Sequence, residues 1–118
     1  MKYQARVVPG KGRGKELGFP TLNLVVNETL PITHGIYGGV VEIDGKEYLG
    51  AFHFGPRPVF ADNEATLEVH IIDTVIDNPP TITFTITKRI RDVHNFPSPE
   101  DLVRQIEKDI EVIKAISD

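Results

Sequence analysis

A segment of glycines alternating with cations lies near the start of the chain. It reads Gly10-Lys11-Gly12-Arg13-Gly14-Lys15-Glu16-Leu17-Gly18. Glycine lets backbone N–H groups turn toward an anion, and the cations add longer-range attraction. The segment matches neither the GxxxxGK[ST] phosphate loop nor the GxGxxG dinucleotide motif. It predicts a loop that could wrap a phosphate, and a flexible basic connection is an equally good interpretation of its composition.

Two neutral oxygen ligands follow directly, in Pro20-Thr21-Leu22-Asn23. Alternate side chains of a strand share a face, so Thr21 and Asn23 lie together while the intervening leucine faces the other way. A hydroxyl and an amide carbonyl so placed suit Mg²⁺, a hard cation that keeps its waters and phosphate ligands. On these residues alone, a solvated strand face is the simpler interpretation.

A carboxylate and an imidazole alternate with apolar residues in Leu67-Glu68-Val69-His70-Ile71. Glu68 and His70 therefore share a face, and a carboxylate fixed on a rigid strand can act as a general base. A plain surface glutamate is the alternative. The histidines show no zinc-ligand spacing, and we interpret all four as ordinary polar positions: His34, His53, His70 and His94.

Short segments with period-two apolar alternation must position these residues. They predict six strands: Tyr3–Val8, Thr21–Val26, Ile36–Ile43, Glu47–Phe54, Thr66–Asp73 and Thr81–Lys88. Asp44-Gly45 predicts a tight hairpin turn. Apolar residues at helical steps from Leu102 to Ile116 predict a helix, with Ser98 as N-cap and Pro99 as first residue. We expect a mainly β domain, a closed antiparallel barrel with the helix covering one opening.

Length and composition limit the class of protein. The 118 residues fit one domain, residues 1–118, and 40% hydrophobic residues suffice for a core. The absence of cysteine excludes disulfides, thiolate zinc sites and thiol nucleophiles. With no apolar run of about 20 residues and no signal-peptide pattern, we expect a cytoplasmic protein without a membrane partner.

The net charge of −4 argues against a nucleic-acid partner, which would require many phosphate-neutralising cations. The first 15 residues nevertheless carry five cations and no acid. This local excess suits a small anion.

The order of these segments resembles the riboflavin kinase (flavokinase) family along nearly the whole chain. The run from Gly12 to Asn23 is similar to the family's glycine-rich loop and PTxN motif. Further matches follow in register: Gly35-Ile36-Tyr37, Gly55-Pro56-Arg57-Pro58-Val59-Phe60, Leu67-Glu68-Val69-His70, and Arg91 to Phe96 with Leu102, Gln105, Ile106 and Asp109. PTxN with a downstream L-E-x-H is a specific combination.

The resemblance implies a six-stranded Greek-key barrel with a C-terminal α-helix that transfers the ATP γ-phosphate to the 5′-hydroxyl of riboflavin, giving FMN and ADP. It implies that Thr21 and Asn23 hold Mg²⁺, that Glu68 takes the hydroxyl proton, and that Arg91 and Phe96 bind the flavin. The nucleotide-binding residues implied are Gly12, Arg13, Gly14, Lys15, Gly18, Pro20, Thr21 and Asn23.

Three single positions and one short segment depart from the family pattern. His53 stands where Asn is common, Val59 where the turn usually has Thr, and Val93 where Glu is usual. Asn78-Pro79-Pro80 replaces a frequent Tyr-Gly pair. These departures predict altered flavin-side loops rather than altered phosphate chemistry.

A non-catalytic flavin- or nucleotide-binding barrel with a regulatory or interaction role is the alternative. Retention of Thr21, Asn23 and Glu68 together favours the enzyme, and aromatics at 8% without a stacking cluster disfavour a nucleic-acid-binding barrel. We expect a monomer with riboflavin/FMN and ATP/ADP as partners. Bacterial relatives often carry an adenylyltransferase domain as well, and no histidine here has the H-x-G-H arrangement of such domains, so we expect FMN and no FAD.

Overall fold

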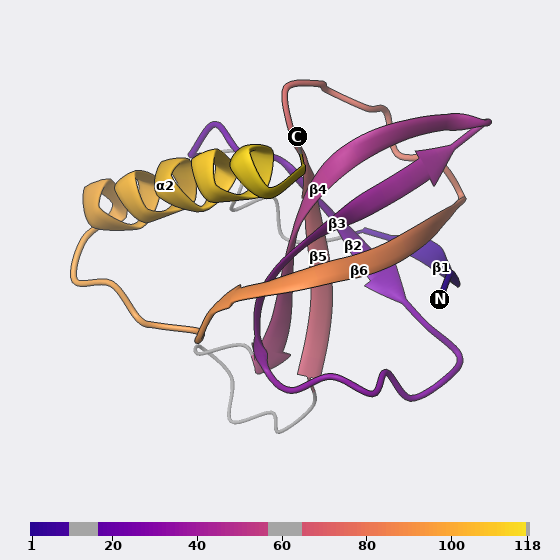
Figure 1. Cartoon of the computed structure of the whole chain (residues 1–118), viewed down its shortest axis with the longest axis horizontal. Coiled ribbons are helices and arrows are strands. Elements are labelled where there is room, and N and C mark those ends of the chain that lie inside the picture. Colours follow the sequence, from indigo (N-terminus) through magenta and orange to yellow (C-terminus); the bar gives the residue numbers. More distant parts are fainter. Residues whose placement is uncertain (10–16, 57–64, 118) are drawn as a thin grey trace.

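A computed structural model describes residues 1–9, 17–56 and 65–117 of the chain. Within these residues the chain forms six strands and a helix (Figure 1): β1 Tyr3–Val8, β2 Thr21–Val25, β3 Gly35–Ile43, β4 Lys46–Pro56, β5 Ala65–Ile71, β6 Thr81–Arg91 and α2 Pro99–Ser117. Every strand pair is antiparallel, and the strands close into a barrel in the order β1-β2-β5-β4-β3-β6.

The strand order is a Greek key, because β3, β4 and β5 are neighbours in sequence order and β6 returns to lie beside β3. The predicted six-stranded Greek-key barrel with a C-terminal helix is therefore confirmed. The predicted turn between β3 and β4 is also confirmed. Asp44 and Gly45 have φ angles of 51° and 80°, and two consecutive positive values give the turn whose twist matches a β-hairpin.

Large apolar side chains fill the barrel. Phe52 and Phe84 are almost fully buried at its centre, with ring centroids 5.4 Å apart. Gly39 and Gly50 are paired across β3 and β4 and leave room for the Phe52 ring. A Cβ atom at Gly39 would lie 2.8 Å from the ring's Cε1, and one at Gly50 would lie 3.1 Å from it. Among the described residues, the interior is thus a packed core of apolar side chains.

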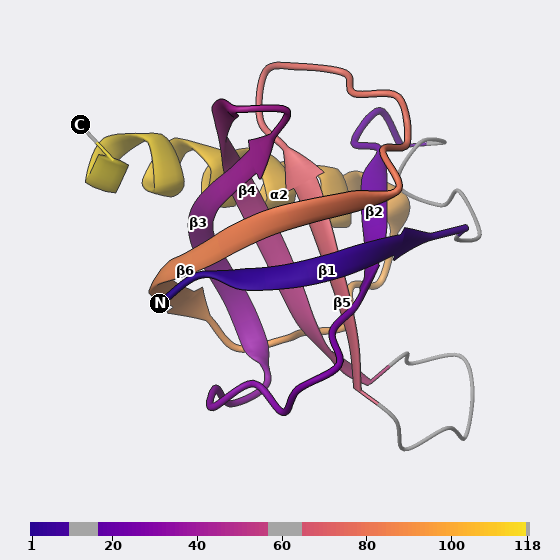
Figure 2. The same cartoon turned by 90° about the vertical axis from the view of Figure 1, so that its right-hand side faces the viewer.

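Helix α2 lies outside the barrel, along its wall, as Figures 1 and 2 show. The expectation that it covers an opening is wrong. Gly38 and Ala51 are paired on the outer wall, and a Cβ at Gly38 would lie 3.1 Å from Cγ1 of the fully buried Ile113. These two small residues let Ile113 pack closely against the wall, whereas Ile106 and Ile110 are half-buried and Ile116 stays exposed.

Both ends of the helix are fixed by polar contacts. Ser98 Oγ accepts a hydrogen bond from the backbone N–H of Asp101 at 3.3 Å, which confirms Ser98 as the N-cap and Pro99 as the first helical residue. Near the other end, Lys114 pairs with Asp73 at 2.7 Å.

In the described residues, no helix is both long and apolar enough to cross a membrane.

Two strand ends differ from the sequence prediction in ways that affect the site. Strand β6 runs three residues beyond Lys88 and ends at Arg91, which pairs with Ile36 of β3. The sequence pattern did not predict this extension, because strands are recognised by apolar alternation and Arg89 and Arg91 are charged. Strand β5 ends at Ile71 instead of Asp73, because Asp73 adopts a φ of 61° and turns the chain.

The close approach at Gly39 can be tested by Gly39→Ala. Its Cβ would collide with the backbone oxygen of Thr85, and no side-chain rotation relieves that clash. We expect a loss of at least about 2 kcal/mol in the free energy of unfolding, measured by urea denaturation. Gly38→Ala on the same strand meets only the Ile113 side chain and should cost less. Equal losses for the two variants would contradict this packing.

Candidate functional site

The register between β2 and β5 brings the sequence-predicted polar residues together. Asn23 pairs directly with Glu68, and Thr21 pairs with His70. On the other side of β5, Glu68 pairs with His53 of β4. The residues that alternate with them are buried inside the barrel: Leu22, Val69 and Phe52. Asn23, Glu68 and His53 therefore form one row across the outer wall of three adjacent strands, and we call it the site row.

The site row presents oxygen ligands close to one another. Directly paired residues have Cβ atoms about 4.5–5.5 Å apart, so the Asn23 amide and the Glu68 carboxylate can reach the same small ligand. Thr21 lies on the same face, one pair along, and all three side chains are partly exposed. Their roles as metal ligands and as base stay predictions.

The donor set fits Mg²⁺ better than a transition metal. A hydroxyl, an amide carbonyl and a carboxylate are hard oxygen ligands. Within the described part of the chain, His, Cys, Asp and Glu form no group of three or more that could hold a metal by themselves. A cation here would need further oxygens from phosphates and water, and Mg²⁺ in nucleotide complexes is bound in that way.

The two residues that follow the glycine-rich segment, Phe19 and Pro20, contact His70 of β5. His70 Nδ1 lies 2.9 Å from the carbonyl oxygen of Pro20, and the Phe19 ring meets the His70 ring edge-on with centroids 5.5 Å apart. Gly18 has a φ of 89°, which favours glycine, so the chain turns there before entering β2. Four of the predicted nucleotide-binding residues lie outside the described residues: Gly12, Arg13, Gly14 and Lys15.

His53 lies next to Glu68 and is mostly buried. Its Nδ1 atom has no hydrogen-bond partner among the described residues. Burial lowers the pKa of His53, and the positive charge of Arg91 and the nearby His34 lower it further. The carboxylate of Glu68 raises the pKa, but by less than burial lowers it. The ring is therefore neutral at pH 7. The interpretation of all four histidines as ordinary polar positions stays a prediction. The register adds that His53 lies opposite Glu68 and that His70 lies opposite Thr21.

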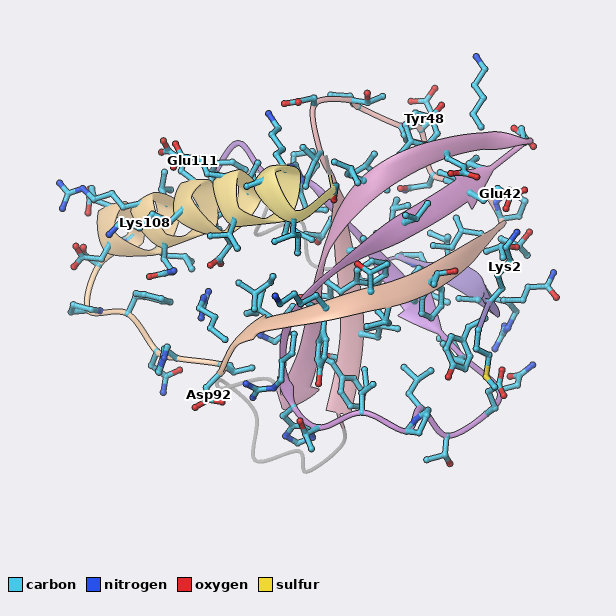
Figure 3. The ribbon with its side chains drawn as sticks, in the orientation of Figure 1. Lys2, Glu42, Tyr48, Asp92, Lys108 and Glu111 are labelled. Carbon is cyan, nitrogen blue, oxygen red and sulfur yellow. The ribbon has the colours of Figure 1, made fainter. Side chains whose placement is uncertain are left out.

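Arg91 and Phe96, the predicted flavin-side residues, lie together beside α2. The guanidinium of Arg91 makes a two-pronged ion pair with Asp109, Nε to Oδ1 at 2.9 Å and Nη2 to Oδ2 at 2.8 Å. Gln105 donates to the same carboxylate at 3.0 Å. The Cζ atom of Arg91 lies 5.7 Å from the centre of the Phe96 ring. In Figure 3, Asp92 marks where the chain leaves β6 toward the helix.

Sequence reasoning gave Asp109 no role, although it is the buried charged residue of the helix. Its i, i+4 spacing from Gln105 was the available signal. Pairing with Ile36 places Arg91 two strands from His53, so this ion pair and the site row share one wall. That wall thus has an oxygen-rich end at β2 and an aromatic, helix-bordered end at β6.

The departures from the family pattern are distributed over this wall. A Cβ at Gly55 would lie 3.2 Å from Val93 Cγ2 and 3.8 Å from His53 Cε1, so His53 and Val93 border the same spot. Asn78 lines a hollow of about 40 Å³ with Pro20 and Thr21. Asn78 therefore lies at the oxygen-rich end of the wall, and the expectation that the segment from Asn78 to Pro80 alters the flavin side stays a prediction. Val59 lies outside the described residues.

Comparison with known proteins shows which family the chain matches. The family model Flavokinase, described as riboflavin kinase, matches residues 1–117. The RNA-binding riboflavin kinase RibR of Bacillus subtilis is 36% identical over 91% of this chain and 47% of its own length. The bifunctional riboflavin kinase/FMN adenylyltransferase of Buchnera aphidicola from Acyrthosiphon pisum is 31% identical over 92% of this chain and 36% of its own.

A solved structure titled as a macrolide-efflux protein from Streptococcus pneumoniae superposes with a TM-score of 0.86 at 35% identity. The match covers 96% of this chain and 38% of that one. The chain thus spans between about a third and a half of the length of these relatives. Because the family model matches residues 1–117, the chain belongs to the riboflavin kinase family.

Proposed function

We propose that this domain transfers the γ-phosphate of ATP to the 5′-hydroxyl of riboflavin, giving FMN and ADP. One observation carries the proposal. The β2–β5 register pairs Asn23 with Glu68 on the outer wall and keeps Thr21 on the same face. A candidate base and two candidate metal ligands are thereby fixed on rigid strands, as phosphoryl transfer requires. Membership in the riboflavin kinase family supplies the substrate class.

Glu68 is the proposed base. Its carboxylate would accept the proton of the 5′-hydroxyl as that oxygen forms its bond to the γ-phosphorus and the bond to the β,γ-bridging oxygen breaks. The proton then passes from Glu68 to solvent, and ADP leaves. In such reactions, positioning and charge neutralisation contribute more than covalent chemistry. Because Glu68 lies on a rigid strand, its carboxylate is held in position for the reaction.

Thr21 and Asn23 are the proposed protein ligands of Mg²⁺. Bound there, the ion would neutralise charge on the transferring phosphate. The Thr21 hydroxyl and the Asn23 amide oxygen would hold it beside Glu68, because the register makes Asn23 and Glu68 direct neighbours. Gly18 and Pro20 precede these ligands and would guide the nucleotide phosphates toward them.

The flavin would lie at the other end of the wall, beside Phe96 and α2. The ion pair with Asp109 holds the guanidinium of Arg91 in a fixed plane next to the Phe96 ring. Such a rigid, partly apolar border suits a planar aromatic ligand.

One relative is named RNA-binding, but the net charge of −4 here does not favour a phosphate-backbone ligand, so small-molecule substrates remain the proposal.

Incubation with riboflavin, ATP and Mg²⁺, followed by chromatography, tests the proposal. We expect FMN and ADP in equal amounts, no product after chelation of Mg²⁺, and neither FAD nor pyrophosphate. Riboflavin binding without FMN formation would instead support the non-catalytic alternative. FAD formation by the purified chain would contradict the proposed chemistry.

Glu68→Gln keeps the shape of the side chain but removes the base. We expect turnover to fall by about 10²- to 10⁴-fold while ATP affinity is retained, measured by steady-state kinetics and calorimetry. Glu47→Gln, at an exposed acid on β4, is the matched control and should be neutral. Turnover near the unsubstituted value in Glu68→Gln would remove Glu68 from this role.

Thr21→Val keeps the β-branched shape and deletes one proposed metal ligand. The Mg²⁺ concentration needed for half-maximal activity should rise several-fold, while the melting temperature changes little. Thr83→Val makes the same change on β6 and should leave the Mg²⁺ requirement unaltered. An unchanged requirement in Thr21→Val would show that this hydroxyl is structural only.

A further inference from the structure

His70, on β5, contacts the residues just before β2. It stands on β5 directly opposite Thr21, and its ring reaches back one residue to Pro20. A carbonyl oxygen can only accept, so at 2.9 Å His70 Nδ1 must carry the hydrogen and donate it. This contact therefore fixes both the tautomer and the orientation of the ring.

The fixed ring also contacts Phe19, which directly follows the glycine-rich segment. Phe19 meets it edge-on, which is a favourable arrangement for two aromatic rings. Gly18, with its φ of 89°, makes the turn just before this contact. The chain is thus held at Phe19 and Pro20, immediately ahead of the proposed Mg²⁺ ligand Thr21.

The location of His70 indicates a local effect. It lies on the outer wall, partly exposed, while its strand neighbours Val69 and Ile71 fill the barrel. Removing its ring would leave the interior packing intact and free the start of β2 to move. Ends of strands open locally at a much lower free energy than the whole domain does.

We propose that His70 is a positioning residue for nucleotide binding, which holds Pro20 so that Thr21 meets the Mg²⁺–nucleotide complex in one fixed geometry. This inference rests on the proposed kinase function. It assigns His70 no contact with substrate and no proton transfer. Its effect should therefore appear in nucleotide affinity and Mg²⁺ requirement, and much less in riboflavin affinity.

Two substitutions separate positioning from mere structure. His70→Asn keeps an N–H donor close to the place of Nδ1, whereas His70→Leu has a similar bulk and no donor. Calorimetry with Mg²⁺–ADP measures nucleotide binding without turnover, riboflavin fluorescence measures flavin binding, and circular dichroism measures the melting temperature.

For His70→Leu we expect about tenfold weaker Mg²⁺–ADP binding, a similar rise in KM for ATP, and riboflavin affinity within about twofold. His70→Asn should recover most of the nucleotide affinity. Unchanged Mg²⁺–ADP binding in His70→Leu would overturn the proposal, and so would an equal loss of nucleotide and riboflavin affinity in both variants.

The proposed function fails separately from this inference. If the unsubstituted chain binds Mg²⁺–ADP but forms no FMN, the kinase proposal is wrong and the comparison of the two His70 variants still decides the positioning role. If the unsubstituted chain does not bind Mg²⁺–ADP at all, both proposals are overturned.

Discussion

The pairing of Asn23 with Glu68 is the constraint on which the rest of the account depends. Side chains alternate along a strand, so a slip of one residue between β2 and β5 would turn Glu68 into the barrel and Val69 out to solvent. The buried side chains of Leu22 and Val69 prevent that slip, because exposing them would cost apolar burial of about 1.5–3 kcal/mol each. The core therefore sets the geometry of the chemistry outside it.

A second constraint comes from the helix on the wall. Gly38 lets Ile113 approach β3 closely, and the ion pair of Arg91 with Asp109 ties β6 to the middle of α2. The side chains of this pair are only 17% and 6% exposed, so removing either partner would leave a charge largely out of water. The same pair keeps Phe96 beside the wall. The ion pair that holds the helix against the wall therefore also holds the proposed border of the flavin site.

Alternation and turn chemistry were sufficient to predict six strands, the Asp44-Gly45 turn and the helix with its Ser98 cap, because these features are encoded locally. The position of the helix was not, since it depends on Gly38 meeting Ile113, which lies 75 residues further along the chain. The surroundings of His53 and His70 were missed for the same reason. The faces shared by Thr21 and Asn23 and by Glu68 and His70 follow from strand period alone, but their meeting across β2 and β5 required the register.

The most direct test of the central claim is a crystal structure of the chain with riboflavin, Mg²⁺ and a non-hydrolysable ATP analogue. We predict the 5′-hydroxyl within about 2.6–3.2 Å of a Glu68 carboxylate oxygen. The Mg²⁺ ion should lie about 2.1 Å from the Thr21 hydroxyl and the Asn23 amide oxygen. Substrates bound on another face of the barrel, or a Glu68 carboxylate turned away from the 5′-hydroxyl, would contradict the account.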